Sequence, residues 1–343
     1  MAKSFAVAML IVGTVIGAGF ASGREIVSFF GLHTSPFTAV LCGIVIFLLS
    51  AMFLFIGSRL NSKNVSEVNV KLTGRFHFIT DAFLLVNNLI VLAGMLAGMD
   101  SLGASFFSAS PLYSIGAGIL CVLVVCKGIK GILNCNKIVV PFIVVPLFFV
   151  CMFTVSMAGA DFSPTFGSVF IIIVYICMNM MLASTVLTTM GKMDRKTILG
   201  ASAIAAIIMG VLIFVLMAAL NSFSDVSADM PVLEMAKKIH PVLYGVMVLI
   251  VAVSIFTTML TAMSGLVSWF EGILGNKLLA AILVLVAGFI LSNLGFSHVV
   301  GILYPIIGVL GVIYTVLGVI FALRSLPFGK AVMLGKNTVR QKR

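Results

Sequence analysis

Long apolar stretches separated by short polar connections make up most of the chain. Ten such stretches are bounded by charged residues, Pro or Gly, at 4–31, 36–58, 76–108, 111–130, 137–158, 168–190, 196–220, 241–269, 277–293 and 297–323. A helix needs roughly 17–25 apolar residues to cross a bilayer. The pattern therefore predicts an all-α integral membrane protein with ten transmembrane helices.

One polar connection is much longer than the others and lies between the seventh and eighth stretches. It contains MPVLEMAKKI, in which apolar and charged residues alternate at helical spacing. This predicts a short amphipathic helix at the membrane surface.

The composition excludes a water-soluble enzyme. Of the 343 residues, 62% are hydrophobic and 9% are charged, whereas a soluble domain has about 25% charged residues. The six cysteines and four histidines do not have the spacing of a metal site. The sequence also has no nucleophile elbow, Walker loop or paired carboxylates, so we expect no enzymatic activity and no cofactor.

The basic residues are distributed as the topology of a membrane protein requires. Of the 21 lysines and arginines, 18 lie at the N-terminus, in alternate connections or in the C-terminal segment 324–343. The exceptions are Arg24, Lys237 and Lys238. Cytoplasmic loops carry the excess of Lys and Arg. We therefore expect a plasma-membrane protein with both termini in the cytoplasm and 324–343 as a basic cytoplasmic tail. The net charge of +11 then reflects topology and contact with lipid, and not nucleic-acid binding.

The ten stretches divide into two halves of nearly equal length. Five lie in 4–158 and five in 168–323. Because five is an odd number, the halves enter the membrane from opposite sides, as in the inverted repeats of many secondary transporters. We expect a single membrane domain, 1–343, built as a 5+5 inverted repeat whose first and sixth helices are interrupted.

The first stretch carries the stronger signal for an interruption. Glycines at 13, 17, 19 and 23 disfavour a continuous helix, and unwound backbone inside a membrane is tolerated where it lines a cavity. A half-helix beginning near Ala21 would point its positive N-terminal end at a substrate carboxylate. The candidate substrate-binding residues here are Gly17, Ala18, Gly19, Phe20, Ala21, Ser22 and Gly23. The alternative is that the small residues serve close helix packing.

In the sixth stretch the corresponding segment is 175–185, which contains neither Gly nor Pro. Tyr175 and Asn179 are four residues apart and share a helix face. We expect them, with Met180, to face the first interruption and contact substrate; the alternative is that they form hydrogen bonds between helices.

Glu25 is the carboxylate that we expect to matter most, because an ionisable residue inside a membrane indicates function. It would contact a substrate amine or carry a coupling proton, the alternative being a charge at the membrane interface. Asp100, late in the third stretch, is a weaker candidate for lining an outer vestibule.

The eighth stretch carries hydroxyls at 254, 257, 258, 261 and 264, close to a single stripe on a helix. Such hydroxyls often bond to their own helix. Opposite unwound carbonyls, the same stripe would supply oxygen ligands to a hard monovalent cation.

The motif GTVIGAGFASGRE, together with YPIIGVLG at 304–311, resembles the YkvI-type membrane proteins, in which the first motif usually ends in Gln-Glu where this chain has Arg24-Glu25. That family is placed in the amino acid–polyamine–organocation superfamily, so the resemblance implies the LeuT-type fold and a transporter. It also implies a sodium site formed by the Gly13 and Ile16 carbonyls with Ser254, Thr257 and Thr258, and a substrate carboxylate held by the Ala18 and Gly19 amides. Phe20 replaces the Asn of a second sodium site.

The function we expect is therefore cation-coupled symport of a small amino acid or a related zwitterion or amine by alternating access. Five neutral oxygens favour sodium as the coupling ion. Two alternatives stay open: proton coupling through Glu25, and a nutrient receptor of the same fold that does not transport.

Overall fold

The computed structural model describes residues 2–32, 34–62, 64–106, 111–159, 168–223, 228 and 230–325, and these residues are almost entirely helical. The helices of the first half are α1 (Ala2–Val15), α2 (Ala18–Ala21), α3 (Arg24–Phe30), α4 (Pro36–Leu60), α5 (Val65–Thr73), α6 (His77–Phe106), α7 (Leu112–Cys126) and α8 (Ile129–Ala158). Those of the second half are α9 (Val169–Leu187), α10 (Arg195–Asn221), α11 (Pro231–Ile239), α12 (Pro241–Leu274), α13 (Lys277–Ser292), α14 (Phe296–His298) and α15 (Tyr304–Ser325). The predicted basic tail lies, beyond Ser325, outside the described residues.

Each of the ten predicted stretches contains an apolar helix. Seven helical segments are long and apolar enough to cross a membrane, at 36–60, 65–104, 131–157, 169–187, 195–221, 241–274 and 296–324. Three shorter apolar helices lie at 3–15, 112–126 and 277–292. The protein is therefore a multi-pass, all-α membrane protein.

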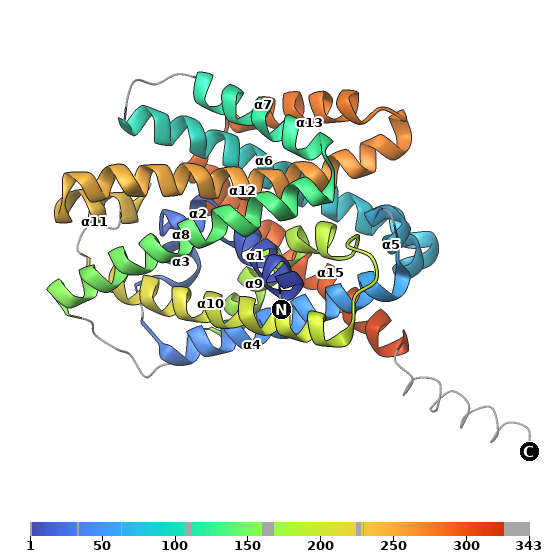
Figure 1. Ribbon diagram of the computed structural model, residues 1–343, viewed down its shortest axis with the longest axis horizontal. Coiled ribbons are helices and arrows are strands. Elements are labelled where there is room, and N and C mark those ends of the chain that lie inside the picture. Colours follow the sequence, from blue (N-terminus) through green and yellow to red (C-terminus); the bar gives the residue numbers. More distant parts are fainter. Residues whose placement is uncertain are drawn as a thin grey trace, which may run out of the picture.

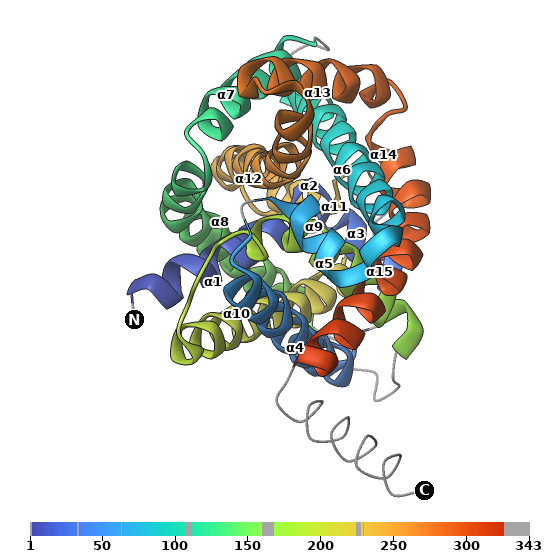
Figure 2. The same cartoon turned by 90° about the vertical axis from the view of Figure 1, so that its right-hand side faces the viewer.

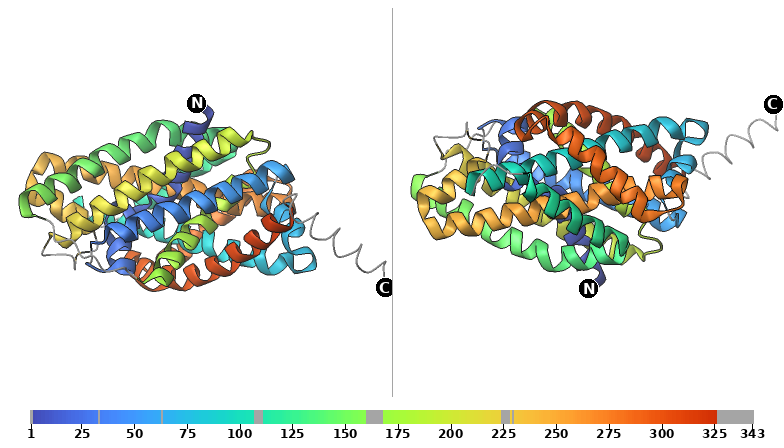
Figure 3. Two further views of the ribbon diagram at one scale, coloured as in Figure 1. Left: turned by 90° about the horizontal axis from the view of Figure 1, so that it is seen from below. Right: turned by 90° about the horizontal axis from the view of Figure 1, so that it is seen from above.

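The long helices run roughly along one direction, so the bundle has two ends. In Figure 1, α11 lies at the left end, and α5 and the last turns of α15 lie at the right end. Figure 2 looks at the right-hand end, with α4 and α10 on one side and α6, α7 and α13 on the other. Helices α1, α9 and α12 lie between them. In Figure 3, α4, α10 and α8 run next to one another when seen from below.

The amphipathic helix predicted in the long connection is present as α11, which buries Val232, Leu233 and Met235. Helix α5, by contrast, was not predicted. The Asn64 side chain caps it, accepting a hydrogen bond from the Glu67 backbone N–H at 2.8 Å. This Asn-x-x-Glu spacing is a signal for the start of a helix.

Asp194 begins α10 in the same way. Its carboxylate accepts hydrogen bonds from the Thr197 backbone N–H at 2.9 Å and from Thr197 Oγ1 at 2.6 Å. These hydrogen bonds lower the pKa of Asp194 from its ordinary value.

Two glycines fix the position of α9 between its neighbours. A Cβ on Gly57 of α4 would lie 2.7 Å from the carbonyl oxygens of Leu187 and Thr188, and a Cβ on Gly311 of α15 would lie 2.8 Å from the carbonyl of Cys177. Because the obstacle is backbone in both cases, larger residues would push the helices apart. Close packing at these glycines holds α9 against the rest of the protein.

The expected interruption of the sixth stretch is wrong. Helix α9 runs unbroken from Val169 to Leu187. The segment lacks Gly and Pro, and its hydroxyls bond back to the helix: Ser184 Oγ donates to the Met181 carbonyl and Thr185 Oγ1 to the Leu182 carbonyl, both at 2.7 Å. Its polar side chains therefore lie on an intact helix.

Candidate functional site

The first stretch is interrupted, as predicted, and it is interrupted twice. Helix α1 ends at Val15, and the Gly17 N–H donates to the Val15 carbonyl at 3.0 Å in a tight turn. Helix α2 then lasts only four residues, and a second break follows at Ser22–Gly23. Gly23 has a φ of 84°, a conformation that residues with a Cβ rarely adopt.

This second break corrects the expectation of one half-helix starting near Ala21. That residue ends α2, and the next helix begins at Arg24. Helix α11 covers the break, because the Val232 N–H donates to the Ser22 carbonyl at 2.9 Å. The chain between Gly17 and Gly23 is therefore a short irregular segment closed from one end of the bundle.

A small polar cavity lies at the first break. It is lined by Thr14, Val15, Gly17, Glu25, Val91, Met95, Met178, Asn179, Leu182, Thr258 and Tyr304. These residues come from α1, α3, α6, α9, α12 and α15 and from the break itself. The cavity volume is about 10 Å³, which suffices for about one water molecule. The structure is thus closed around this point, and a solute the size of an amino acid requires helix movement to enter or leave.

Glu25 is the one acidic residue in the cavity lining, and its side chain is 3% exposed. Its carboxylate folds back over Gly19, where an added Cβ would lie 2.7 Å from the Glu25 Cδ. Tyr175 Oη donates a hydrogen bond to Glu25 Oε2 at 3.3 Å. Among the described residues no cation pairs with Glu25, and the Nε of the neighbouring Arg24 is itself buried without a partner. The structure therefore holds a buried carboxyl group in position with no ion-pair partner among the described residues.

Asn179 lines the cavity from the intact helix α9, and Tyr175, one turn earlier on the same helix, lies outside the lining and reaches Glu25. The Tyr175 ring packs against Phe29 at 5.1 Å and Phe30 at 5.2 Å between ring centroids. Asn179 Nδ2 donates to the Tyr175 carbonyl at 3.1 Å. The aromatic contacts hold Tyr175 beneath Glu25, and Asn179 reaches the cavity.

A cluster of neutral oxygens lies beside the cavity, where α1 meets α12. The Gly13 carbonyl accepts hydrogen bonds from Thr257 Oγ1 at 3.2 Å and Thr258 Oγ1 at 3.3 Å. Thr258 Oγ1 also lies 3.4 Å from the Thr14 carbonyl. Both threonines are buried. The structure therefore brings together three of the five residues expected to bind a cation.

Of the other two expected cation ligands, Ser254 offers a different atom from the one expected, and Ile16 lies at the first break. The Ser254 hydroxyl turns away and donates to the Val251 carbonyl at 2.8 Å, since a serine in a helix readily bonds to its own backbone. It is the Ser254 carbonyl that lies near the cluster, 3.0 Å from Thr257 Oγ1. Ile16 lies between α1 and α2, and its N–H donates to the Val12 carbonyl at 2.8 Å.

Several expected substrate contacts lie outside the cavity lining. Phe20, Ala21 and Met180 are fully buried among apolar side chains. Ala18 faces Gly98 of α6, and the Ser22 hydroxyl donates to the Gly19 carbonyl at 3.2 Å.

Asp100, the weaker candidate, is half-buried near the end of α6. It caps α7, accepting hydrogen bonds from the Ser114 N–H at 3.0 Å and Ser114 Oγ at 2.7 Å.

Sequence reasoning missed seven cavity residues: Thr14, Val15, Val91, Met95, Met178, Leu182 and Tyr304. Tyr304 opens the YPIIGVLG motif, and Thr14 lies inside the glycine-rich motif, so both could have been found from their motifs. The apolar residues carry no such signal, because they resemble any other membrane-spanning sequence.

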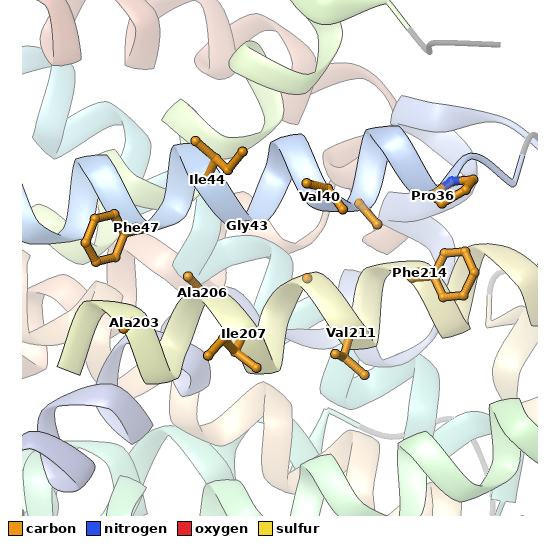
Figure 4. A pocket seen from close by; sticks show the side chains of 12 residues that line it. Pro36, Val40, Gly43, Ile44, Phe47, Ala203, Ala206, Ile207, Val211 and Phe214 are labelled. Atoms are coloured by element: carbon orange, nitrogen blue, oxygen red, sulfur yellow. The ribbon is translucent and has the colours of Figure 1, made fainter. Parts of the chain in front are cut away.

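A larger apolar groove lies away from these polar residues. It runs between α4 and α10, has a volume of about 640 Å³ and is lined by apolar side chains (Figure 4). Val40 and Ile207, which line it, are each more than half exposed, so the groove faces the hydrocarbon of the bilayer. It offers no hydrogen-bonding group for a polar solute.

Two known proteins are similar in sequence to this chain over most of its length. The uncharacterized membrane protein YkvI of Bacillus subtilis is 28% identical over 88% of this chain and 91% of its own length. The uncharacterized protein YyaD of the same organism is 26% identical with the same coverage. No family model matches the sequence.

Solved structures of transporters share the fold. MhsT in complex with L-phenylalanine has a TM-score of 0.67 at 16% identity, covering 94% of this chain and 88% of its own. A Na⁺-coupled sialic acid symporter has a TM-score of 0.69 at 13% identity, covering 93% and 78%. At these identities the likeness shows that the chain shares the fold of these proteins.

A third neighbour was solved in two conformations. Mhp1, a nucleobase-cation-symport-1 family transporter, matches with a TM-score of 0.65 at 15% identity in a closed conformation with bromovinylhydantoin bound, covering 89% of this chain and 74% of its own. Its inward-facing conformation matches with a TM-score of 0.57. The closed form is therefore the better match, as the small cavity would suggest. The predicted resemblance is thereby confirmed: the chain is a relative of the YkvI-type membrane proteins and has the LeuT-type fold.

Proposed function

We propose that the protein is a secondary transporter that carries a small amino acid, or a related zwitterion or amine, together with a cation. The observation that supports this most is the position of Glu25 and Asn179. Both line a closed cavity at a helix break, directly beside an oxygen cluster that joins α1 to α12. A solute site and an ion site that share one helix break can be coupled, because filling one changes the backbone of the other.

The chemistry of the cavity fits a solute with an amine. Glu25 supplies a buried carboxyl group that the ammonium group of a solute would pair with, and Tyr175 contacts it through a hydrogen bond at 3.3 Å. The backbone N–H groups around Ala18 and Gly19 would meet a carboxylate on the same solute. Such a solute satisfies the carboxylate that the protein itself leaves without a cation.

The oxygen cluster fits a hard monovalent cation such as sodium. Its candidate ligands are the Gly13, Ile16 and Ser254 carbonyls and the Thr257 and Thr258 hydroxyls. All five are neutral and none titrates near pH 7, so the site suits a metal cation better than a proton. A bound ion would tie α1 to α12 and favour one facing of the transport cycle.

We also infer that 4–158 and 168–323 are inverted repeats and that both termini are cytoplasmic. In support, the second segment (α4) packs against the seventh (α10), and the third (α6) packs against the eighth (α12). These are the pairs that a two-fold axis relating the two halves would bring together. The distribution of lysine and arginine supports the orientation.

Proton coupling is the second candidate, because Glu25 is the one titratable carboxylate at the cavity. In that case Glu25 would carry the proton, and the oxygen cluster would serve only to pack α1 on α12.

The first test is a thermal-shift screen of the purified protein with the twenty amino acids and simple amines, in sodium chloride and in choline chloride. A ligand of the native state raises the melting temperature, and we expect one chemical class to do so more strongly in sodium. Counterflow of that compound in proteoliposomes then separates a transporter from a receptor. Binding without counterflow would contradict the proposal and favour the receptor.

A further inference from the structure

The end of the bundle that carries α5 contains a pocket that is more polar than the groove between α4 and α10. This inner vestibule is lined by α5 with its cap Asn64, by the first turns of α6 and by the last turns of α12, and its volume is about 510 Å³. Figure 2 looks at this end, where α5 lies in front between α6 and α15. Asp81 and His77 of α6 line the vestibule, with His77 Nδ1 3.3 Å from Asp81 Oδ2.

A chain of buried hydrogen bonds leads from the vestibule to α9. Asp81 Oδ1 accepts from Asn69 Nδ2 of α5 at 2.6 Å. Asn69 Oδ1 accepts from Tyr314 Oη of α15 at 3.4 Å. Ser184 Oγ of α9, whose proton is donated to the Met181 carbonyl at 2.7 Å, lies 3.4 Å from Tyr314 Oη on the other side. All four side chains are at least nine-tenths buried. The chain thus joins four helices across the space between the vestibule and the central cavity.

Unsatisfied polar groups line the part of α6 between this chain and the cavity. The Asn87 carboxamide and the Asn88 Oδ1 are buried and have no hydrogen-bond partner among the described residues. Asn88 shares a helix face with Val91 and Met95, which line the cavity, and it lies about 5 Å from Val91 along the axis.

Thr185 of α9 lies at the same level as Asn88. A Cβ on Gly265 of α12 would lie 3.0 Å from both Asn88 Nδ2 and Thr185 Oγ1, so the two side chains meet at this glycine. A buried polar group without a partner is costly, and water or a polar solute passing along this face would satisfy it.

We propose that solute leaves the central cavity along this face of α6 into the inner vestibule, and that the Asp81–Asn69–Tyr314–Ser184 chain is the gate that closes the route. The gate opens at Tyr314. Its contacts with Asn69 and Ser184 are both long, at 3.4 Å, and join neutral groups, which makes them weak. The 2.6 Å bond from Asn69 to the Asp81 carboxylate is short and strong by comparison. Opening therefore parts α9 and α15 from α5 and α6, while α5 stays attached to α6. This inference rests on the proposed transport function.

The gate is tested with a variant that removes one hydroxyl. Tyr314→Phe keeps the ring, which stacks on Phe53 at 6.0 Å between centroids, and removes the hydroxyl that contacts Asn69 and Ser184. Thr185→Cys, in a background without the native cysteines, reports access to the route. Its reaction with a membrane-impermeant cationic methanethiosulfonate reagent is followed in inverted and in right-side-out vesicles. Tyr244→Phe, at the opposite end of the bundle, is the matched control.

We expect Tyr314→Phe to raise the labelling rate at position 185 about two- to tenfold in inverted vesicles, the population change that follows the loss of a weak neutral hydrogen bond. Asn69→Leu should give a similar increase, and the two changes together should add little, because they open the same gate. An unchanged rate, an equal increase with Tyr244→Phe, or an increase only in right-side-out vesicles would overturn the proposal. Labelling requires no solute, so it reports on the gate even if counterflow fails and the transport function is wrong.

Discussion

The contact between Gly19 and Glu25 makes a single methyl group a sensitive probe of the site. In Gly19→Ala, the new Cβ would overlap the Glu25 side chain, with its Cδ 2.7 Å away. That side chain can rotate, so the carboxylate is displaced and the backbone is not. Displacement breaks the hydrogen bond from Tyr175, which at 3.3 Å belongs at the weak end of the range of about 1.5–3 kcal/mol for bonds to charged groups.

A loss of about 1.5 kcal/mol corresponds to roughly a tenfold change in an equilibrium constant. We therefore expect Gly19→Ala to weaken the apparent affinity for solute at least about tenfold in proteoliposome uptake, with a melting temperature close to that of the wild type. Gly116→Ala is the matched control, because nothing lies within 4 Å of a Cβ at that position. Wild-type affinity in Gly19→Ala would refute the role given to the position of Glu25.

Three further substitutions test the remaining parts of the site. Thr257→Val/Thr258→Val removes two hydroxyls at nearly constant volume, and we expect the sodium-dependent rise in melting temperature to disappear; a wild-type sodium response would move the ion elsewhere. Asn179→Ala should raise KM without loss of folded protein, because Asn179 bonds only to its own helix at 3.1 Å; an unchanged KM would remove it from the solute site. Glu25→Gln should abolish binding of amines in the thermal-shift assay, and retained binding with an unchanged pH profile would exclude Glu25 from both solute and proton roles.

Much of the fold follows from the sequence because membrane-spanning helices need long apolar runs. The first interruption was also predictable, since the glycines between Gly13 and Gly23 disfavour helix within a span. The second break could not be located in the same way, because Gly23 is required for its positive φ of 84° and not for its low helix propensity. The break predicted for the sixth stretch by analogy with the first is absent, because the residues of α9 locally favour an unbroken helix.

The candidate site was only partly predictable, for physical reasons that differ by residue. Glu25 stands out in any sequence as a carboxylate within a membrane span. The pairing of Gly13 with Thr257 and Thr258 depends on the packing of α1 against α12. Residue spacing alone does not predict that packing, and the pairing was predicted from the resemblance of the motifs to a known family. Met95 and Met178 line the cavity because of where their helices cross, which the sequence does not show. The hydrogen bond between Asn69 and Asp81 involves α5, a helix that the hydropathy pattern did not predict.

The proposed transport cycle depends most on coupling of solute movement to sodium. The most direct measurement is uptake of the solute identified by the thermal-shift screen into wild-type proteoliposomes, with an inward sodium gradient or an inward proton gradient imposed separately at a clamped membrane potential. We predict accumulation that follows the sodium gradient and is insensitive to the proton gradient. Accumulation that follows the proton gradient and ignores sodium would contradict the ion site between α1 and α12, and would assign the coupling role to Glu25.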